Sequence, residues 1–307
     1  MVLKAYRTVT LFLLIWIVVF TSSCRATPPP PTAAPALFTA SPAPISDTPT
    51  AVPPTPTPVP LAALVNGEGI TLQEYQEELA RYQAVAETVG TNMATIGEQI
   101  VLEDMVNQVL LAQAAAEAGF LVDQQMVQER LEQLASEIGG EQSLSGWMAD
   151  NGYTRQSLAR FMAWTLASAW MRDTIIDSVP LTADQVHVRQ ILLNDAETAQ
   201  DVLGRLESGR DFDELAYQYD PLIGGDLGWM PKGYLAEEAL DDAIFTLEQG
   251  ETSPVIETGL GFHILLVVEA ATERPLSPDA RFVLQDRALR EWLDLRRSQS
   301  DIQLLLP

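Results

Sequence analysis

Residues 240–267 read LDDAIFTLEQGETSPVIETGLGFHILLV. We predict a short helix over about residues 237–247, followed by strands over about residues 254–257 and 262–269, because short apolar runs bounded by glycine are typical of strands. His263 stands at the start of the second strand, beside a run of five aliphatic residues at positions 264–268. The stretch therefore predicts one helix and a pair of strands, with a histidine at the edge of an apolar run.

The residues upstream complete a compact unit of helices and strands. Residues 185–193 have strand character, and Asp195 opens a helix that Gly209 ends. Asp211 and Glu214 have the spacing of a capping box at the start of a further helix. A glycine-rich loop, GGDLGW, follows at residues 224–229. We therefore predict an α+β domain over residues 181–272, in which a small sheet is surrounded by helices.

Helices are predicted on both sides of this domain. Over residues 61–180, a short strand and turn (LVNGEGI) leads into a capping box at Thr71 and Glu74 and then into amphipathic helices. A last helix over residues 278–298 carries apolar side chains that need a partner surface, and the tail IQLLL can add a strand. We expect this segment (residues 278–307) to complete the N-terminal helical domain, so that the α+β domain is an insertion in it.

The first 60 residues have the pattern of an export signal and a spacer. Lys4 and Arg7 precede an apolar run over residues 11–20, which is too short to span a bilayer as a stable helix. We interpret residues 1–23 as a secretory signal peptide. Because the signal ends at Cys24, it resembles a bacterial lipoprotein signal, which implies lipidation of Cys24 and a membrane anchor outside the cytoplasm; an ordinary signal peptide is the alternative. Residues 24–60 are rich in Pro, Thr and Ala and are typical of an extended linker.

Composition excludes several classes of function. The chain has 42 acidic and 18 basic residues, a formal net charge of -24, which repels the phosphate backbone of nucleic acid. Cys24 is its one cysteine, so no disulfide within the chain is possible. His187 and His263 are its two histidines, and no cluster has the spacing of zinc or calcium ligands. We therefore expect no metal and no cofactor.

Five stretches of residues 181–272 resemble the parvulin family of peptidyl-prolyl cis-trans isomerases, or rotamases, whose domain is also named PpiC. The matching stretches are VHVRQILL, GRDFDELAYQY, GGDLGWM, LDDAIFTLEQGETSPVIET and GLGFHILLV. The helical part, with VNGEGITLQEY and LEDMVNQVLLAQAAAEAGF, resembles the N-terminal domains of SurA-like and PrsA-like foldases. The resemblance implies a chaperone-like helical domain that carries an isomerase domain.

The resemblance also implies which residues form the site. His263 matches the second histidine of the family, whereas Gln190 stands where the family has its first. Asp220 matches an acidic or cysteine position before the glycine-rich loop, although the loop here is shorter and Asp220 can equally cap the turn at Pro221. Thr258 matches a hydroxyl residue near the second histidine. The apolar wall that receives the proline ring matches Leu227, Leu235 and Leu240, each of which can equally be plain core.

The sequence therefore predicts an extracytoplasmic, lipid-anchored foldase that isomerises prolyl bonds in unfolded or partly folded exported polypeptides. The alternative is a chaperone or peptide-binding module whose parvulin-like domain is weak or inactive. Gln190 and the short loop at Asp220 favour the alternative, and His263 with the apolar positions favours the enzyme. The sequence leaves open the client proteins, the residue preferred before proline and the oligomeric state.

Overall fold

The computed structural model describes residues 59–89 and 94–306. The predicted signal peptide, Cys24 and nearly all of the predicted linker lie outside the described residues. The described chain forms a helical domain (residues 61–177 and 278–304) and a sheet domain (residues 182–275). Within this part of the chain, no helix combines the length and the apolar character that crossing a membrane requires.

The helical domain begins with a hairpin of β1 (Leu61–Val65) and β2 (Glu68–Thr71). Asn66 and Gly67 form its turn, and both have a positive φ, of 51° and 85°. A two-residue turn with this geometry matches the twist of paired strands, and Asn-Gly is the pair that adopts it most readily. The sequence predicted a strand and a turn here, and the structure adds the second strand.

Five helices follow the hairpin. They are α1 (Leu72–Val89), α2 (Ala94–Glu117), α3 (Gln124–Glu137), α4 (Glu141–Asp150) and α5 (Arg155–Asp177). The predicted capping box is confirmed, because Glu74 accepts hydrogen bonds from Thr71 and the hydroxyl of Thr71 accepts one from the Glu74 N–H. Helix α2 includes Gly97, a poor helix former, where a Cβ atom would lie 2.9 Å from the ring of Tyr82 in α1.

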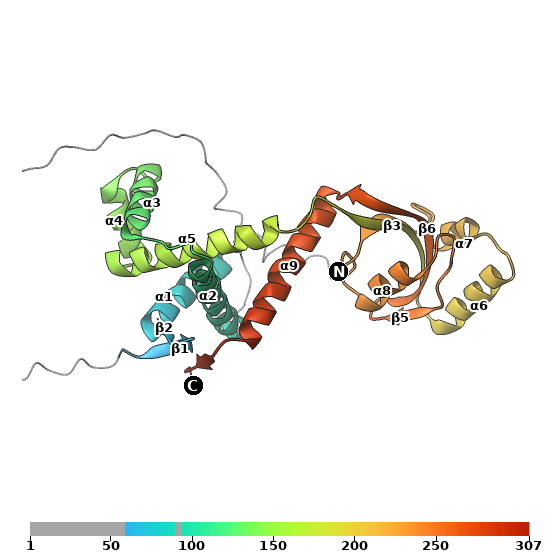
Figure 1. Cartoon of the computed structure of the whole chain (residues 1–307). Coiled ribbons are helices and arrows are strands. Elements are labelled where there is room, and N and C mark those ends of the chain that lie inside the picture. The colour runs from blue at the N-terminus through green and yellow to red at the C-terminus, as the bar shows by residue number, and fades with distance from the viewer. Residues whose placement is uncertain (1–58, 90–93, 307) are drawn as a thin grey trace, which may run out of the picture. The chain divides into compact units, whose positions relative to one another are not determined.

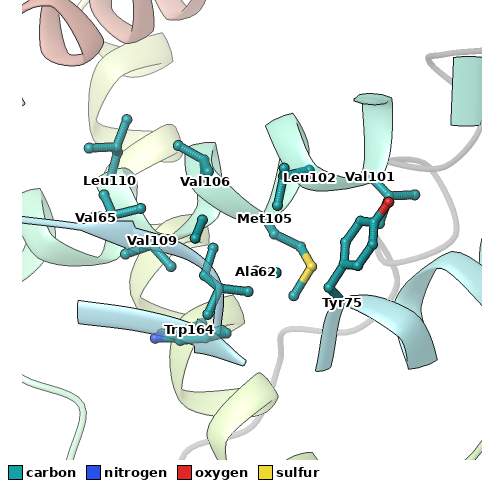
Figure 2. Close-up of a cluster of buried hydrophobic side chains, with 12 residues drawn as sticks. Ala62, Val65, Tyr75, Val101, Leu102, Met105, Val106, Val109, Leu110 and Trp164 are labelled. Carbon is teal, nitrogen blue, oxygen red and sulfur yellow. The ribbon is translucent and has the colours of Figure 1, made fainter. Parts of the chain in front are cut away.

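The main core of the helical domain lies where α2 crosses the hairpin (Figure 2). Its buried side chains come from β1, β2, α1, α2 and α5, and they include Val65, Tyr75, Met105, Val109, Leu110 and Trp164. The Trp164 indole N–H donates to the carboxylate of Glu68 over 2.8 Å, so the one polar atom of this ring is satisfied.

The C-terminal segment returns to the helical domain, as predicted. Helix α9 (Pro278–Ser298) packs against α5 and α2, and β7 (Ile302–Leu304) pairs antiparallel with β1 (Figure 1). Arg297 of α9 donates to the side chain of Asn107 in α2 over 2.7 Å. The first and last parts of the chain therefore share one domain, and the sheet domain is inserted between α5 and α9.

The sheet domain has four antiparallel strands in the order β4-β3-β6-β5. Its elements in chain order are β3 (Thr182–Leu193), α6 (Ala196–Glu207), α7 (Phe212–Tyr219), β4 (Asp226–Pro231), α8 (Glu238–Thr246), β5 (Ile256–Thr258) and β6 (Gly261–Pro275). Side chains alternate along each strand, so the sheet has two apolar faces. One packs against α6 and α7 and the other against α8.

Three predictions for this domain were wrong in detail. The GGDLGW stretch is not a loop throughout, since Asp226 onward forms β4 against β3. Strands β3 and β6 are longer than predicted, because their outer ends pair with each other even where apolar alternation has stopped. The capping box at Asp211 is half formed: its carboxylate accepts the Glu214 N–H, but the Glu214 carboxylate binds Arg210.

Candidate functional site

His263 lies on β6, the strand between β3 and β5. Its direct neighbours across the sheet are Leu192 of β3 and Ile256 of β5. Alternation along β3 and β6 places Gln190, Leu192, His263 and Leu265 on the face that α8 covers. Ile191, Leu193 and Ile264 point to the opposite face, into the core under α6 and α7. His263 is 2% exposed, so both nitrogens of its ring need partners inside the protein.

Each nitrogen of the His263 ring has a hydrogen-bond partner inside the protein. The Nε2 atom lies 2.8 Å from the hydroxyl of Thr258, and Nδ1 lies 3.1 Å from Oε1 of Gln190. Because Oε1 only accepts, Nδ1 carries the proton and donates it to Gln190. The Thr258 hydroxyl then donates to Nε2 and itself accepts the Leu260 N–H over 3.1 Å. The ring is therefore fixed as one neutral tautomer by a chain of four groups.

Burial also favours the neutral ring. Desolvation lowers the pKa of His263 below its ordinary value, and the nearby charge of Glu237 opposes this only in part. At neutral pH the imidazole is therefore uncharged. With one nitrogen donating and the other accepting, the ring is suited to orienting its neighbours rather than to attacking a substrate.

Gln190 is fixed through its backbone as well. Its N–H donates to the carbonyl of Gly225 over 2.8 Å. Gly225 has a φ of 68°, and a Cβ atom there would lie 1.8 Å from the Gln190 carbonyl oxygen. Only glycine allows so close an approach, which explains the second glycine of GGDLGW. The loop before β4 is thereby pressed against the strand that carries Gln190.

Asp220 acts on this same loop. One of its carboxylate oxygens accepts the N–H groups of Leu222 and Ile223, and the other accepts the N–H of Gly225 over 3.2 Å. The structure thus places Asp220 at the C-terminal end of α7, where it caps the turn. Its connection to Gln190 is indirect and runs through Gly225. Of the two readings of Asp220, this geometry favours the capping one.

The three predicted apolar residues lie on the α8 face of the sheet, in one cluster. Leu240 is buried in this core, whereas Leu227 and Leu235 are partly exposed and pack at its edge. Leu240 is therefore core, and Leu227 and Leu235 are the members that a bound side chain can reach. Other members of the cluster include Val186, Val188, Met230, Ile244, Phe245, Ile256, Leu265 and Val267.

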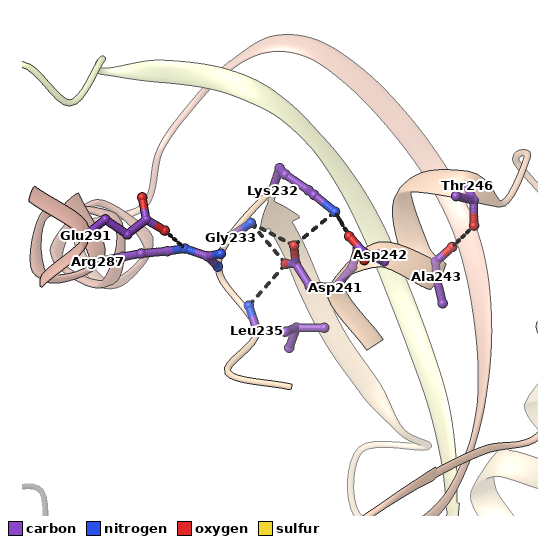
Figure 3. Close-up of polar contacts among 9 residues, drawn as sticks. All are labelled: Lys232, Gly233, Leu235, Asp241, Asp242, Ala243, Thr246, Arg287 and Glu291. Atoms are coloured by element: carbon purple, nitrogen blue, oxygen red, sulfur yellow. Dashed lines mark hydrogen bonds and ion pairs between the residues drawn. The ribbon is translucent and has the colours of Figure 1, made fainter. Parts of the chain in front are cut away.

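Asp241 holds the segment that carries Leu235 (Figure 3). Its buried carboxylate accepts the Gly233 N–H with both oxygens, each over 3.0 Å, and the Leu235 N–H over 3.4 Å. Lys232 lies 3.3 Å from the same carboxylate and also pairs with Asp242, an interaction that raises the pKa of Lys232. A buried charge is stable only with such partners, so Asp241 fixes the backbone beside the apolar edge.

His187 lies apart from these residues. Its Nε2 atom is 2.8 Å from the carboxylate of Asp226, its ring stacks on Trp229, and Arg274 covers the same indole. Hydrogen bonding to His187 lowers the pKa of Asp226. His187 therefore belongs to a separate cluster across β3, β4 and β6.

Sequence reasoning missed Leu192, Ile256 and Asp241. Strand alternation placed Leu192 on the face of Gln190, but pairing it with His263 requires the register of β3 and β6. Ile256 lies in β5, a strand of three residues, which is too short for an alternation of apolar and polar residues to be recognised in the sequence. An acidic residue on the apolar face of LDDAIF was the available signal for Asp241.

Two family matches cover much of the described chain. Residues 193–269 match the PPIC-type PPIASE (rotamase) domain, and residues 59–152 match the SurA-like N-terminal domain. The first therefore falls within the sheet domain, and the second covers the hairpin and the first helices of the helical domain.

Several curated relatives are named foldase protein PrsA, and two of them align over 200 residues or more. The one from Halalkalibacterium halodurans is 32% identical over 207 residues, which cover 60% of this chain and 61% of the relative. The one from Caldanaerobacter subterraneus subsp. tengcongensis is 30% identical over 226 residues, which cover 67% of this chain and 72% of the relative.

A crystal structure of the peptidylprolyl isomerase PrsA from Bacillus anthracis covers 64% of this chain and 94% of its own, at 20% identity and a TM-score of 0.42. The family matches and the two curated relatives agree with the resemblance inferred from the sequence. The chain belongs to the PrsA family of foldases, in which a PpiC-type (parvulin) peptidyl-prolyl isomerase domain accompanies a SurA-like helical domain.

Proposed function

We propose that this chain catalyses cis-trans isomerisation of prolyl bonds in unfolded or partly folded proteins outside the cytoplasm. The observation that carries the proposal is the neutral, doubly hydrogen-bonded His263 beside Gln190 and the apolar edge of Leu227 and Leu235. Such a site offers a fixed polar wall and an apolar surface.

Prolyl isomerisation requires only such a polar wall and apolar surface. Isomerisation breaks no bond; its barrier of about 18–20 kcal/mol comes from the partial double-bond character of the amide. A thousandfold acceleration requires about 4 kcal/mol of preferential binding to the twisted amide. The apolar edge supplies contact with the pyrrolidine ring and excludes water. The network of Gln190, His263 and Thr258 costs no reorganisation, because its hydrogen bonds are already made.

The helical domain is proposed to hold the client. Helices α2, α5 and α9 meet around a cavity of about 350 Å³, whose lining includes Met171, Trp292 and Leu295. Apolar side chains at such a surface suit unfolded segments, and the net charge of -24 favours cationic segments over nucleic acid. Relatives named foldase protein PrsA and chaperone SurA support a role in binding unfolded polypeptides.

We further propose that the mature chain is a lipoprotein anchored at Cys24 on the outer side of a membrane. The order of basic, apolar and small residues before Cys24 supports this, as does the Pro-rich stretch that follows. In an extended conformation the linker reaches about 100 Å, at about 3.1 Å per residue. The two folded domains would then work at a distance from the membrane surface.

The isomerase activity is tested by comparing wild type with Gln190→His on X-Pro peptides. We expect measurable wild-type turnover and a gain of about tenfold, or roughly 1.4 kcal/mol, in the variant, because an imidazole is more rigid than a flexible amide. Gln249→His, at an exposed turn, is the matched control and should change nothing. If neither wild type nor Gln190→His turns over, the sheet domain is a peptide-binding module. A slower variant would show that glutamine is the adapted residue.

The pH dependence of kcat/KM should report the protonation of the His263 ring. Because burial lowers the pKa of folded His263, activity should be constant at neutral pH and fall only at pH values lower than about 6.5, the ordinary pKa of a free imidazole. The neutral ring likewise contributes stability that is complete above the unfolded pKa and lost as pH falls toward the lower folded pKa.

His263→Ala should remove that inflection and lower kcat/KM by about ten- to a hundredfold, or 1.4–2.7 kcal/mol. His187→Gln, which changes the other histidine of the chain, should keep the inflection. An unchanged profile in folded His263→Ala would reduce His263 to a structural residue.

The chaperone activity should stay with the helical domain. Residues 182–275 can be replaced by a short Gly-Ser linker, because the Leu276 N–H already donates to the Leu181 carbonyl over 2.9 Å. We expect this variant to keep most of the ability to suppress aggregation of an unfolded client, measured by light scattering. A folded variant, verified by circular dichroism, that leaves aggregation unchanged would contradict the assignment.

Lipid anchoring is tested with Cys24→Ser, which should move the protein from the membrane to the soluble fraction, because stable anchoring requires two or more acyl chains or signals. Ser23→Ala, which keeps the acceptor cysteine, is the control and should stay with the membrane. Membrane association of Cys24→Ser at the wild-type level would refute the anchor.

A further inference from the structure

Four aliphatic side chains are exposed around the site. Leu222 and Ile223, in the loop after Asp220, are 91% and 54% exposed, and Leu260, in the turn between β5 and β6, is 65% exposed. Leu192 of β3 is 40% exposed although it lies in the sheet. We call these four residues the rim. Exposed aliphatic residues around a polar network are typical of a binding surface.

Each rim residue is connected to the polar network. Leu192 pairs with His263 across β3 and β6. The Leu260 N–H donates to Thr258, whose hydroxyl binds the ring of His263. Leu222 and Ile223 belong to the loop whose Gly225 accepts the Gln190 N–H. The rim therefore lies beside the predicted site, on three different elements.

Hydrogen bonds and packing fix the position of the rim residues. Asp220 accepts the N–H groups of both Leu222 and Ile223, which fixes the backbone of the most exposed segment. The side chain of Leu192 reaches the turn of Leu260, since a Cβ atom on Gly261 would lie 3.2 Å from its Cδ1. A fixed apolar surface loses little conformational entropy when it binds an apolar group.

The charges of the sheet domain disfavour an acidic ligand. Residues 182–275 contain 19 acidic and five basic residues. The five basic side chains are all engaged: Arg189 with Asp213, Arg205 with Asp201, Arg210 with Glu214, Lys232 with Asp241 and Asp242, and Arg274 over Trp229. A negative side chain at the rim would meet repulsion without a cation to offset it.

We propose that the rim binds the side chain that immediately precedes the proline, and that the enzyme therefore prefers a large aliphatic or aromatic residue at this position. An acidic residue there is the least favoured. The inference rests on the proposed isomerase function and deepens it, because it assigns the residues that select the substrate.

The test uses the full-length protein and four peptides of the form Ala-X-Pro-Phe, in which X is Leu, Ala, Lys or Glu. We expect kcat/KM to be highest for Leu and lowest for Glu. Replacing rim residues, as in the double variant Leu222→Ser with Ile223→Ser and in Leu260→Ser, should lower the ratio of Leu to Ala by about three- to tenfold, in line with the loss of partly buried methyl and methylene groups.

Leu121→Ser is the matched control, because Leu121 is 72% exposed and lies in the helical domain. It should reproduce the wild-type ratio. Rim variants that slow all four peptides equally, or a wild type that prefers Glu, would overturn the proposal.

The same peptides separate this inference from the proposed function. If no peptide is turned over, their dissociation constants are measured by titration. Weaker binding of the Leu peptide alone in the rim variants supports the rim without catalysis, and equal constants for all variants overturn it.

Discussion

The antiparallel ladder between β3 and β6 runs from Thr182 opposite Pro275 to Leu193 opposite Phe262. Its outer end brings together the two points where the chain leaves and re-enters the helical domain. Its inner end sets Leu192 beside His263 and puts Gln190 within reach of the same ring. A slip of one residue would turn Gln190 toward α6 and α7. One register thus determines both the insertion of the domain and the geometry of the site.

Carboxylates that bind backbone N–H groups hold the segments around this ladder. Asp220 fixes the loop pressed against Gln190, and Asp241 fixes the segment of Leu235. Without these two carboxylates, the backbone N–H groups of the irregular segments would have no partner, which is costly where water is excluded. An acidic chain has many such groups available. Part of the charge excess therefore has a structural use, in addition to its effect on partners.

Local signals predicted the helices that begin after Thr71 and Asp195 and the central parts of β1, β3, β5, β6 and β7, because caps and apolar alternation depend on neighbouring residues. They did not predict β2 and β4 as strands. The resemblance to the parvulin family then identified Gln190, Thr258 and His263, which the structure brings into contact. What local signals missed depends on pairing over long distances. The outer end of β6 has no apolar pattern and is a strand only because β3 lies beside it. The burial of Leu240 likewise follows from tertiary contacts.

Glutamine at position 190 changes what the network can do with protons. A second imidazole at this position would add a second titrating group to the network, beside His263. The amide accepts the same hydrogen bond from His263 but does not titrate. The network then contains one titrating group, and burial lowers the pKa of that group. Because twisting a prolyl amide transfers no proton, such a site loses no chemical step by staying neutral. The charge state of the network then stays constant to a lower pH than that of an ordinary histidine.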